Sequence, residues 1–157
     1  MTACPSPSLQ RSCGVARLSF CRADGQSRLV RMHQSGSAKA FVHPHTAGPE
    51  VVFLNTSGGM TGGDTLSYAL DLGERCRVTA TTQTAERAYR SAAGLAQVEI
   101  CHRLGSGAHL DWLPQETILF DHAALIRRTT VALSGTASCL LLEAVVLGRT
   151  AMGETLT

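Results

Sequence analysis

Three glutamates interrupt apolar stretches of this chain, and they are its clearest candidates for chemistry. Glu116 lies in the run 112–120, Glu143 lies in the run 140–147, and Glu154 lies close to the end of the sequence. A carboxylate on a buried face is costly unless it is paired, hydrated or bound to a metal. Each acid therefore pairs with an arginine or faces solvent, or the three line a polar passage for a transient divalent cation. The arginines considered as partners are Arg87, Arg90 and Arg149.

A glycine-rich segment, Asn55 to Asp64, follows the apolar run 51–54. Two glycine pairs so close together predict a backbone that takes positive φ or passes very near other groups, with Asp64 capping the turn. Backbone N–H groups in such a loop could bind an anion or a nucleotide. The segment lacks a Gly-Lys-Ser/Thr ending and a Gly-x-Gly-x-x-Gly spacing, which favours a structural or partner-contact loop. The residues assigned to this loop are Asn55, Gly58, Gly59, Gly62, Gly63 and Asp64.

Motifs for catalysis or stable metal binding are missing from the sequence. There is no Gly-x-Ser-x-Gly or His-Glu-x-x-His string, and the six cysteines include no Cys-x-x-Cys pair. His43 and His45 are too few to hold a metal by themselves. We therefore predict a non-catalytic chain without a tightly bound cofactor. Because catalytic triads are spatial, a small β-sheet enzyme or an anion-binding protein that uses the loop 55–64 stays open as the alternative.

Composition argues against nucleic-acid and membrane partners. The net charge is +2 and only 4% of the residues are aromatic, so neither a basic stripe nor a stacking platform is evident. The apolar run Cys139 to Leu147 is too short to span a bilayer and contains Glu143. No secretory signal is visible at the start of the sequence. These features predict a soluble, cytoplasmic protein.

The elements that must position these residues are expected to be strands. Turn signals about every 8 to 14 residues, with little helical periodicity, predict an all-β fold. We expect a mainly antiparallel sandwich or layered sheets, with at most one or two short helices. The segment Ala85 to Ala93 fits a short helix or a strand. Residues 1–13 are predicted to form a disordered lead-in and residues 14–157 a single β domain. Turns or hairpins are expected at Asp24-Gly25, Leu72-Gly73, Gly105 to Gly107 and Ser134-Gly135.

The glycine segment also carries a family resemblance. It resembles the Asn-Thr-(Ala/Ser)-Gly-Gly-(Leu/Met)-Thr-Gly-Gly-Asp signature of the urease accessory protein family UreD, also called UreH. Four further segments match that family in the same order, so the resemblance extends from about Gly14 to Glu154. They are Gln34 to Lys39, Thr81 to Ser91, Leu110 to Phe120 and Gly148 to Glu154.

The resemblance implies a function that the residues alone do not. Proteins of this family are non-catalytic chaperones that act with UreF and the GTPase UreG on apo-urease, so that its nickel centre is assembled. It also implies a predominantly β fold, and the link to nickel delivery favours a passage for nickel(II) past the three glutamates. The family pattern continues well beyond the Gly148 to Glu154 segment, whereas this sequence stops at Thr157. We therefore expect an N-terminal portion or truncated form, incomplete at its C-terminus.

Overall fold

The computed structural model describes residues 10–149, 153, 154 and 156, and this part of the chain is built from strands alone. Since no helix forms in these ranges, none is present there with the length and hydropathy to cross a membrane. The all-β prediction is confirmed. The strands are β1 (Cys13–Ala23), β2 (Gln26–Gly36), β3 (Ala38–His43), β4 (Glu50–Asn55), β5 (Thr65–Leu72), β6 (Arg77–Thr82), β7 (Glu86–Ala88), β8 (Ala96–Leu104), β9 (His109–Trp112), β10 (Thr117–Leu119), β11 (Leu125–Leu133), β12 (Ser138–Leu141) and β13 (Val145–Leu147).

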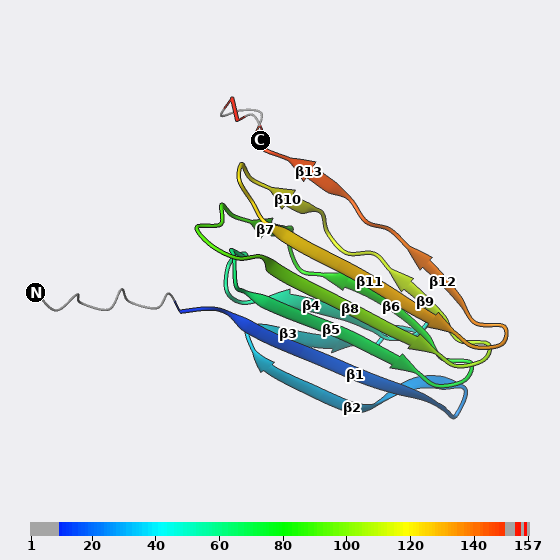
Figure 1. Cartoon of the computed structure of the whole chain (residues 1–157). Helices are drawn as coiled ribbons and strands as arrows, with labels where there is room; N and C mark the ends of the chain where they lie inside the picture. The colour runs from blue at the N-terminus through cyan, green and yellow to red at the C-terminus, as the bar shows by residue number, and fades with distance from the viewer. Residues whose placement is uncertain (1–9, 150–152, 155, 157) are drawn as a thin grey trace, which may run out of the picture.

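The strands form three sheets that the chain visits in rotation (Figure 1). The first sheet has the order β11-β8-β5-β1-β2, the second β12-β9-β6-β4-β3, and the third β13-β10-β7. From β5 onward the chain passes from the first sheet to the second, then to the third, and returns to the first one strand further along. Each circuit is a coil stacked on the coil before it, in the manner of a β-solenoid. The register follows this stacking, because Thr65 pairs with Gln97 and Gln97 pairs with Ile126.

The prediction of mainly antiparallel pairing is wrong. Among the named strands, only β1 with β2 and β3 with β4 pair antiparallel, and all other pairs are parallel. The Asp24-Gly25 hairpin is confirmed, because both residues have positive φ, 51° and 73°, and β1 pairs with β2 across them. The turns at 72–73, 105–107 and 134–135 instead carry the chain from the first sheet to the second. A corner between sheets needs the same glycines as a hairpin, so the two are alike in sequence.

The segment Ala85 to Ala93 contains a strand and no helix. Its central residues form β7, which pairs in parallel with β10 in the third sheet. Ala88 also makes a parallel bridge to Met60, so the glycine segment occupies the third-sheet position of the coil before β5. Tertiary pairing therefore outweighs the helical preference of the Ala, Glu and Arg residues in this segment.

The hydrophobic core lies between the sheets and contains a cluster of aromatic rings. Strand β8 alternates strictly between buried and exposed residues, as expected when one face of a sheet is covered. Phe53 packs against Tyr68, with ring centroids 4.6 Å apart, and against Trp112, at 5.9 Å. The ring of His102 lies 4.7 Å from Trp112, and neither of its nitrogens has a hydrogen-bond partner among the described residues. This imidazole is therefore buried with no hydrogen-bond partner for either ring nitrogen among the described residues.

The segment that leads into β1 is hydrogen-bonded to the rest of the fold. The carbonyl of Ser12 accepts a hydrogen bond from the backbone N–H of Thr65, and that of Cys13 accepts one from Ser37. These contacts fall before the predicted domain boundary at Gly14. Most of the predicted lead-in, residues 1–9, lies outside the described residues.

Candidate functional site

The glycine segment is fastened at its middle by backbone hydrogen bonds to two other parts of the chain. The N–H of Met60 donates to the carbonyl of Arg87 at 2.7 Å, and the N–H of Tyr89 donates to the carbonyl of Met60 at the same distance. Further along, the N–H of Gly63 donates to the carbonyl of Leu95 at 3.0 Å. The loop is therefore part of the third-sheet corner.

At two positions of the loop the residue must be glycine, because neighbouring groups lie where a Cβ would be. Gly59 has φ of +140°, and a Cβ there would meet the Tyr89 ring and lie 2.9 Å from the carbonyl oxygen of Arg87. Gly62 is buried, and a Cβ there would overlap the side chain of Ser91 and the carbonyl oxygens of residues 93 and 94. Any larger residue at these positions would push neighbouring backbone away.

Asp64 is a buried carboxylate that closes the loop. One of its oxygens accepts a hydrogen bond from the N–H of Thr61 and the other accepts one from the N–H of Ser12, both at 2.8 Å. The aspartate therefore caps its own turn and ties the loop to the segment that leads into β1. With both oxygens used inside the fold, Asp64 is a structural acceptor.

Most N–H groups in the second half of the loop are already engaged. The N–H groups of Met60, Thr61, Gly63 and Asp64 all donate to acceptors within the protein. The N–H of Ser57 also donates to Oδ1 of Asn55, at 3.1 Å. An anion nest needs successive N–H groups that are free to face a ligand. The tip, residues 56–58, is exposed, as is Gly63 near the base, and at Gly58 an added Cβ would meet open space. The geometry supports a contact loop with an exposed tip and an anchored base.

Glu86 is a potential site residue that sequence reasoning missed. Its carboxylate accepts hydrogen bonds from Nδ2 of Asn55 at 3.3 and 3.4 Å, so it joins the start of β7 to the start of the glycine segment. Burial raises the pKa of Glu86, and the hydrogen bond from Asn55 and the charge of Arg127 partly offset that rise. A cavity of about 50 Å³ lies beside it, lined by Tyr68 and Gly59 among others. That volume holds a water molecule or a small ion.

A polar row continues from Glu86 through the interior. Burial raises the pKa of Tyr68, and the neighbouring charge of Glu86 adds to the effect. Arg127, on the inward face of β11, places Nε 3.4 Å from Oε1 of Glu143, and the same oxygen accepts a hydrogen bond from Oγ1 of Thr129 at 2.6 Å. A cavity of about 200 Å³ lies beside Arg127. Charged and polar side chains thus extend along the third-sheet side of the core.

The three glutamates singled out from sequence lie in different surroundings. Glu143 pairs with Arg127 as described, and Glu154 accepts hydrogen bonds from the N–H and the guanidinium of Arg149, one of the arginines considered from sequence. The hydrogen bond from Arg149 lowers the pKa of Glu154. Glu116 is half-buried, and its carbonyl accepts the N–H of Glu86 at 2.9 Å. In the described ranges no three His, Cys, Asp or Glu side chains converge as a metal-binding group.

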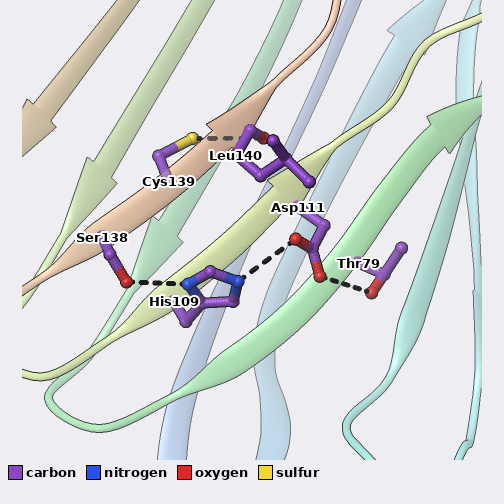
Figure 2. A network of polar contacts seen from close by, with 6 residues as sticks. All are labelled: Thr79, His109, Asp111, Ser138, Cys139 and Leu140. Carbon is purple, nitrogen blue, oxygen red and sulfur yellow. Dashed lines mark hydrogen bonds and ion pairs between the residues drawn. The ribbon is translucent and has the colours of Figure 1, made fainter.

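A serine, a histidine and an aspartate do meet on the outer face of the second sheet (Figure 2). Nδ1 of His109 lies 2.7 Å from Oγ of Ser138, and Nε2 lies 3.1 Å from Oδ1 of Asp111. Figure 2 shows that Thr79 also contacts Asp111, with Oγ1 donating to Oδ2 at 3.4 Å. This order resembles a catalytic triad, so it is the best structural case for the enzyme alternative.

The surroundings of this trio do not suit nucleophilic catalysis. His109 and Asp111 retain about a third of their side-chain exposure, 31% and 30%, and Ser138 is exposed on the edge strand β12. The trio lines neither of the cavities of about 430 and 440 Å³ found elsewhere. Hydrolysis by a serine needs an enclosed site in which a substrate is held against oxyanion donors. We interpret the contacts of His109 with Ser138 and of Asp111 with Thr79 as cross-strand pairs between stacked coils, and the His109–Asp111 contact as one between neighbours on the same face of β9.

A stack of parallel coils, with an anchored glycine loop and an interior row of paired polar groups, defines a β-solenoid class of protein. Comparison with known proteins supports this assignment. Residues 12–157 match the family model described as UreD urease accessory protein. The chain is similar to three proteins named urease accessory protein UreD. It is 58% identical to the one from Cereibacter sphaeroides over 98% of this chain. It is 54% identical to the one from Dinoroseobacter shibae over 97% of this chain, and 52% identical to the one from Paracoccus denitrificans over 94%.

The chain belongs to the UreD urease accessory protein family, as its sequence motifs predicted. This is a family of accessory proteins and not of enzymes, so the prediction of a non-catalytic chain is confirmed at that level. The alignments cover 56%, 55% and 52% of those three relatives, so the chain spans about half the length of the curated relatives it matches.

Proposed function

We propose that this chain acts in the maturation of urease, as a non-catalytic platform for GTP-dependent nickel insertion into apo-urease together with UreF and UreG. The observation that carries the proposal is the family match over residues 12–157. Under this proposal the chain works in the cytoplasm and holds nickel(II) only in transit, with no tightly bound cofactor. Partners dock on its surface, and the exposed tip of the glycine loop, residues 56–58, is one point of contact.

The interior acids supply a route for the nickel in this proposal. The corner between the second and third sheets carries an acid in three successive coils, at Glu86, Glu116 and Glu143. Carboxylates spaced along one corner can exchange a cation, whereas a site with three or more ligands would retain it. Arg127 places a positive charge near both Glu86 and Glu143, and this charge opposes the rise in the pKa of Glu86 that burial causes.

Glu154 has a different role in this proposal. It follows β13 in the chain and is engaged by Arg149 and by the N–H of Asp121, at 3.0 Å. We therefore propose that Glu154 fixes the local chain and that transit involves the other three acids.

The test compares Glu86→Gln and Glu116→Gln with Glu99→Gln, a matched change on the exposed face of β8. Each variant is expressed with urease and the other accessory proteins. The nickel content of purified urease is measured beside pull-down of UreF and urease. We expect the Glu86 variant, and to a lesser degree the Glu116 variant, to keep the partners and lose nickel transfer. If the variants lose both partner binding and nickel transfer, the acids have a structural role. If the variants keep both, the proposed nickel route is contradicted.

A further inference from the structure

A cleft of about 430 Å³ lies at the far end of the β1–β2 hairpin from the glycine loop, and nothing above assigns it a role. One wall is the hairpin tip, and the other is the connection between β3 and β4. The charged residues that line the cleft are Arg22, Arg28 and Arg77, and no acidic residue lines it. Its apolar lining includes Leu29, Val42 and Pro49.

Both walls of the cleft are fixed to the backbone of Arg77. The N–H of Arg77 donates to Oγ of Ser27 at 2.8 Å, which holds the hairpin against the start of β6. On the other side, Gly48 has φ of +134°, and a Cβ there would lie 2.5 Å from the carbonyl oxygen of Arg77. The carbonyl of Pro49 also accepts the N–H of Thr79 at 3.2 Å. The cleft is therefore shaped before any ligand arrives, which reduces the cost of binding.

The guanidinium groups in the cleft have little internal compensation. Arg28 pairs with Asp24 at 3.4 Å, but both side chains are more than half exposed, so the pair contributes little. Arg22 and Arg77 form no ion pair with any described residue. Arginine presents a planar fork of N–H donors that matches the oxygens of a carboxylate or phosphate. Two unpaired forks facing one cleft favour an anionic occupant.

His45 adds a further polar group. Its Nδ1 accepts a hydrogen bond from the N–H of Ala47 at 3.2 Å, so in the neutral ring the proton is on Nε2. That tautomer makes the imidazole a donor on its other side, in the same cleft lining as the arginines. The lining thus combines hydrogen-bond donors with apolar surface.

We propose that this cleft binds an oxyanion group, carboxylate or phosphate, carried on an apolar body. The arginines hold the oxyanion, and the surface of Leu29, Val42 and Pro49 covers the apolar part. The volume lies within the range of about 300 to 1,000 Å³ that small-molecule sites occupy. The same chemistry could be supplied by a free organic anion or by an acidic side chain of a partner protein, and the test separates these sources.

The test uses isothermal titration calorimetry of the intact chain with three probes. They are phenyl phosphate, inorganic phosphate, and a short peptide of alternating aspartate and leucine. Arg77→Gln and Arg22→Gln are compared with Arg128→Gln, which removes the same charge from an exposed position on β11. Thermal unfolding of each variant verifies that the fold is kept.

We expect saturable binding of phenyl phosphate, weaker binding of inorganic phosphate, and a loss of affinity of about tenfold in each cleft variant but not in Arg128→Gln. Tenfold corresponds to about 1.4 kcal/mol. Tighter binding of phenyl phosphate than of the peptide supports a free anion as the occupant, and the reverse order supports a partner protein. The proposal is overturned if no probe binds saturably, or if the cleft variants and Arg128→Gln bind equally.

Discussion

Nε of Arg127 lies 3.4 Å from Oε1 of Glu143, and this contact connects the first sheet to the corner that leads into β13. The arginine side chain is 17% exposed and the glutamate 36%, so the pair is partly shielded from solvent. Because the charge of Arg127 also opposes the rise in the pKa of Glu86, one guanidinium serves two acids that belong to the first and third of three successive coils. The interior polar row therefore depends on Arg127.

Replacing this arginine should destabilise the fold in a pH-dependent way. Arg127→Gln removes the cation that Glu86 and Glu143 share, and we expect a loss of about 1 to 2 kcal/mol in the free energy of unfolding at pH 7. The loss should shrink as the pH falls toward 4, because burial raises the pKa of Glu86 and a protonated Glu86 needs no cation. Urea denaturation at several pH values measures this. A loss that is the same at pH 4 and pH 7 would mean that the effect is not electrostatic.

The glycine loop offers a test that separates steric overlap from backbone strain. Gly62→Ala introduces a Cβ against two backbone carbonyl oxygens, whereas Gly58→Ala introduces one into open space at φ of +79°. We expect about 1 kcal/mol of destabilisation for Gly58→Ala, from its left-handed backbone, and about 3 kcal/mol for Gly62→Ala, from overpacking. The midpoints of urea unfolding give both values. Equal midpoints would contradict the close approach of residues 91–94 to this loop.

Sequence reasoning succeeded where a signal was local. The Asp24-Gly25 hairpin was predictable because few residue pairs adopt two consecutive positive φ angles. The all-β class followed from the spacing of the turns. By contrast, whether a turn joins two strands of one sheet or carries the chain to another sheet depends on pairing between distant residues. Thr65, Gln97 and Ile126 stack on one another and mark the repeat from coil to coil. A search of the sequence for this repeat could have revealed the solenoid.

The polar row could be predicted only in part. Acids inside apolar runs drew attention to Glu116 and Glu143, because burying a charge requires a reason. Glu86 was missed because it lies in a segment whose composition also fits a helix, where no buried face is defined. Its partner Asn55 is separated from it by 31 residues in sequence, and only the winding of the coil brings the two side chains together.

The buried histidine should make stability depend on pH. Burial lowers the pKa of His102 to about 4, while in the unfolded chain it is about 6.5. Between these values the unfolded state binds the proton and the folded state does not, so stability falls as the pH drops below 6.5 and this contribution levels off below 4. A full shift of this size corresponds to about 3 kcal/mol. Wild type should lose up to that amount relative to His102→Leu between pH 7 and pH 4, and parallel stability curves for the two proteins would refute the assignment.

The last coil should drive self-association of the isolated chain. Within the described residues, strands β11, β12 and β13 each lie at one edge of a sheet, and Leu140, Val145 and Leu147 are 54%, 58% and 63% exposed. Unpaired edges with apolar side chains recruit other chains. Sedimentation should show concentration-dependent oligomers that Leu140→Lys reduces, while Val30→Lys, on the opposite edge strand β2, has a smaller effect. A clean monomer at high concentration would contradict this prediction.

The most direct test of the proposed function is the nickel content of urease in cells that express its subunits and the other accessory proteins, with and without this gene product. A platform for nickel insertion acts on assembly and not on synthesis. The account therefore predicts that, without the protein, urease subunits accumulate at their normal level but contain almost no nickel, and that restoring the gene restores the metal. Urease that carries its full nickel content in the absence of the protein would contradict the central claim.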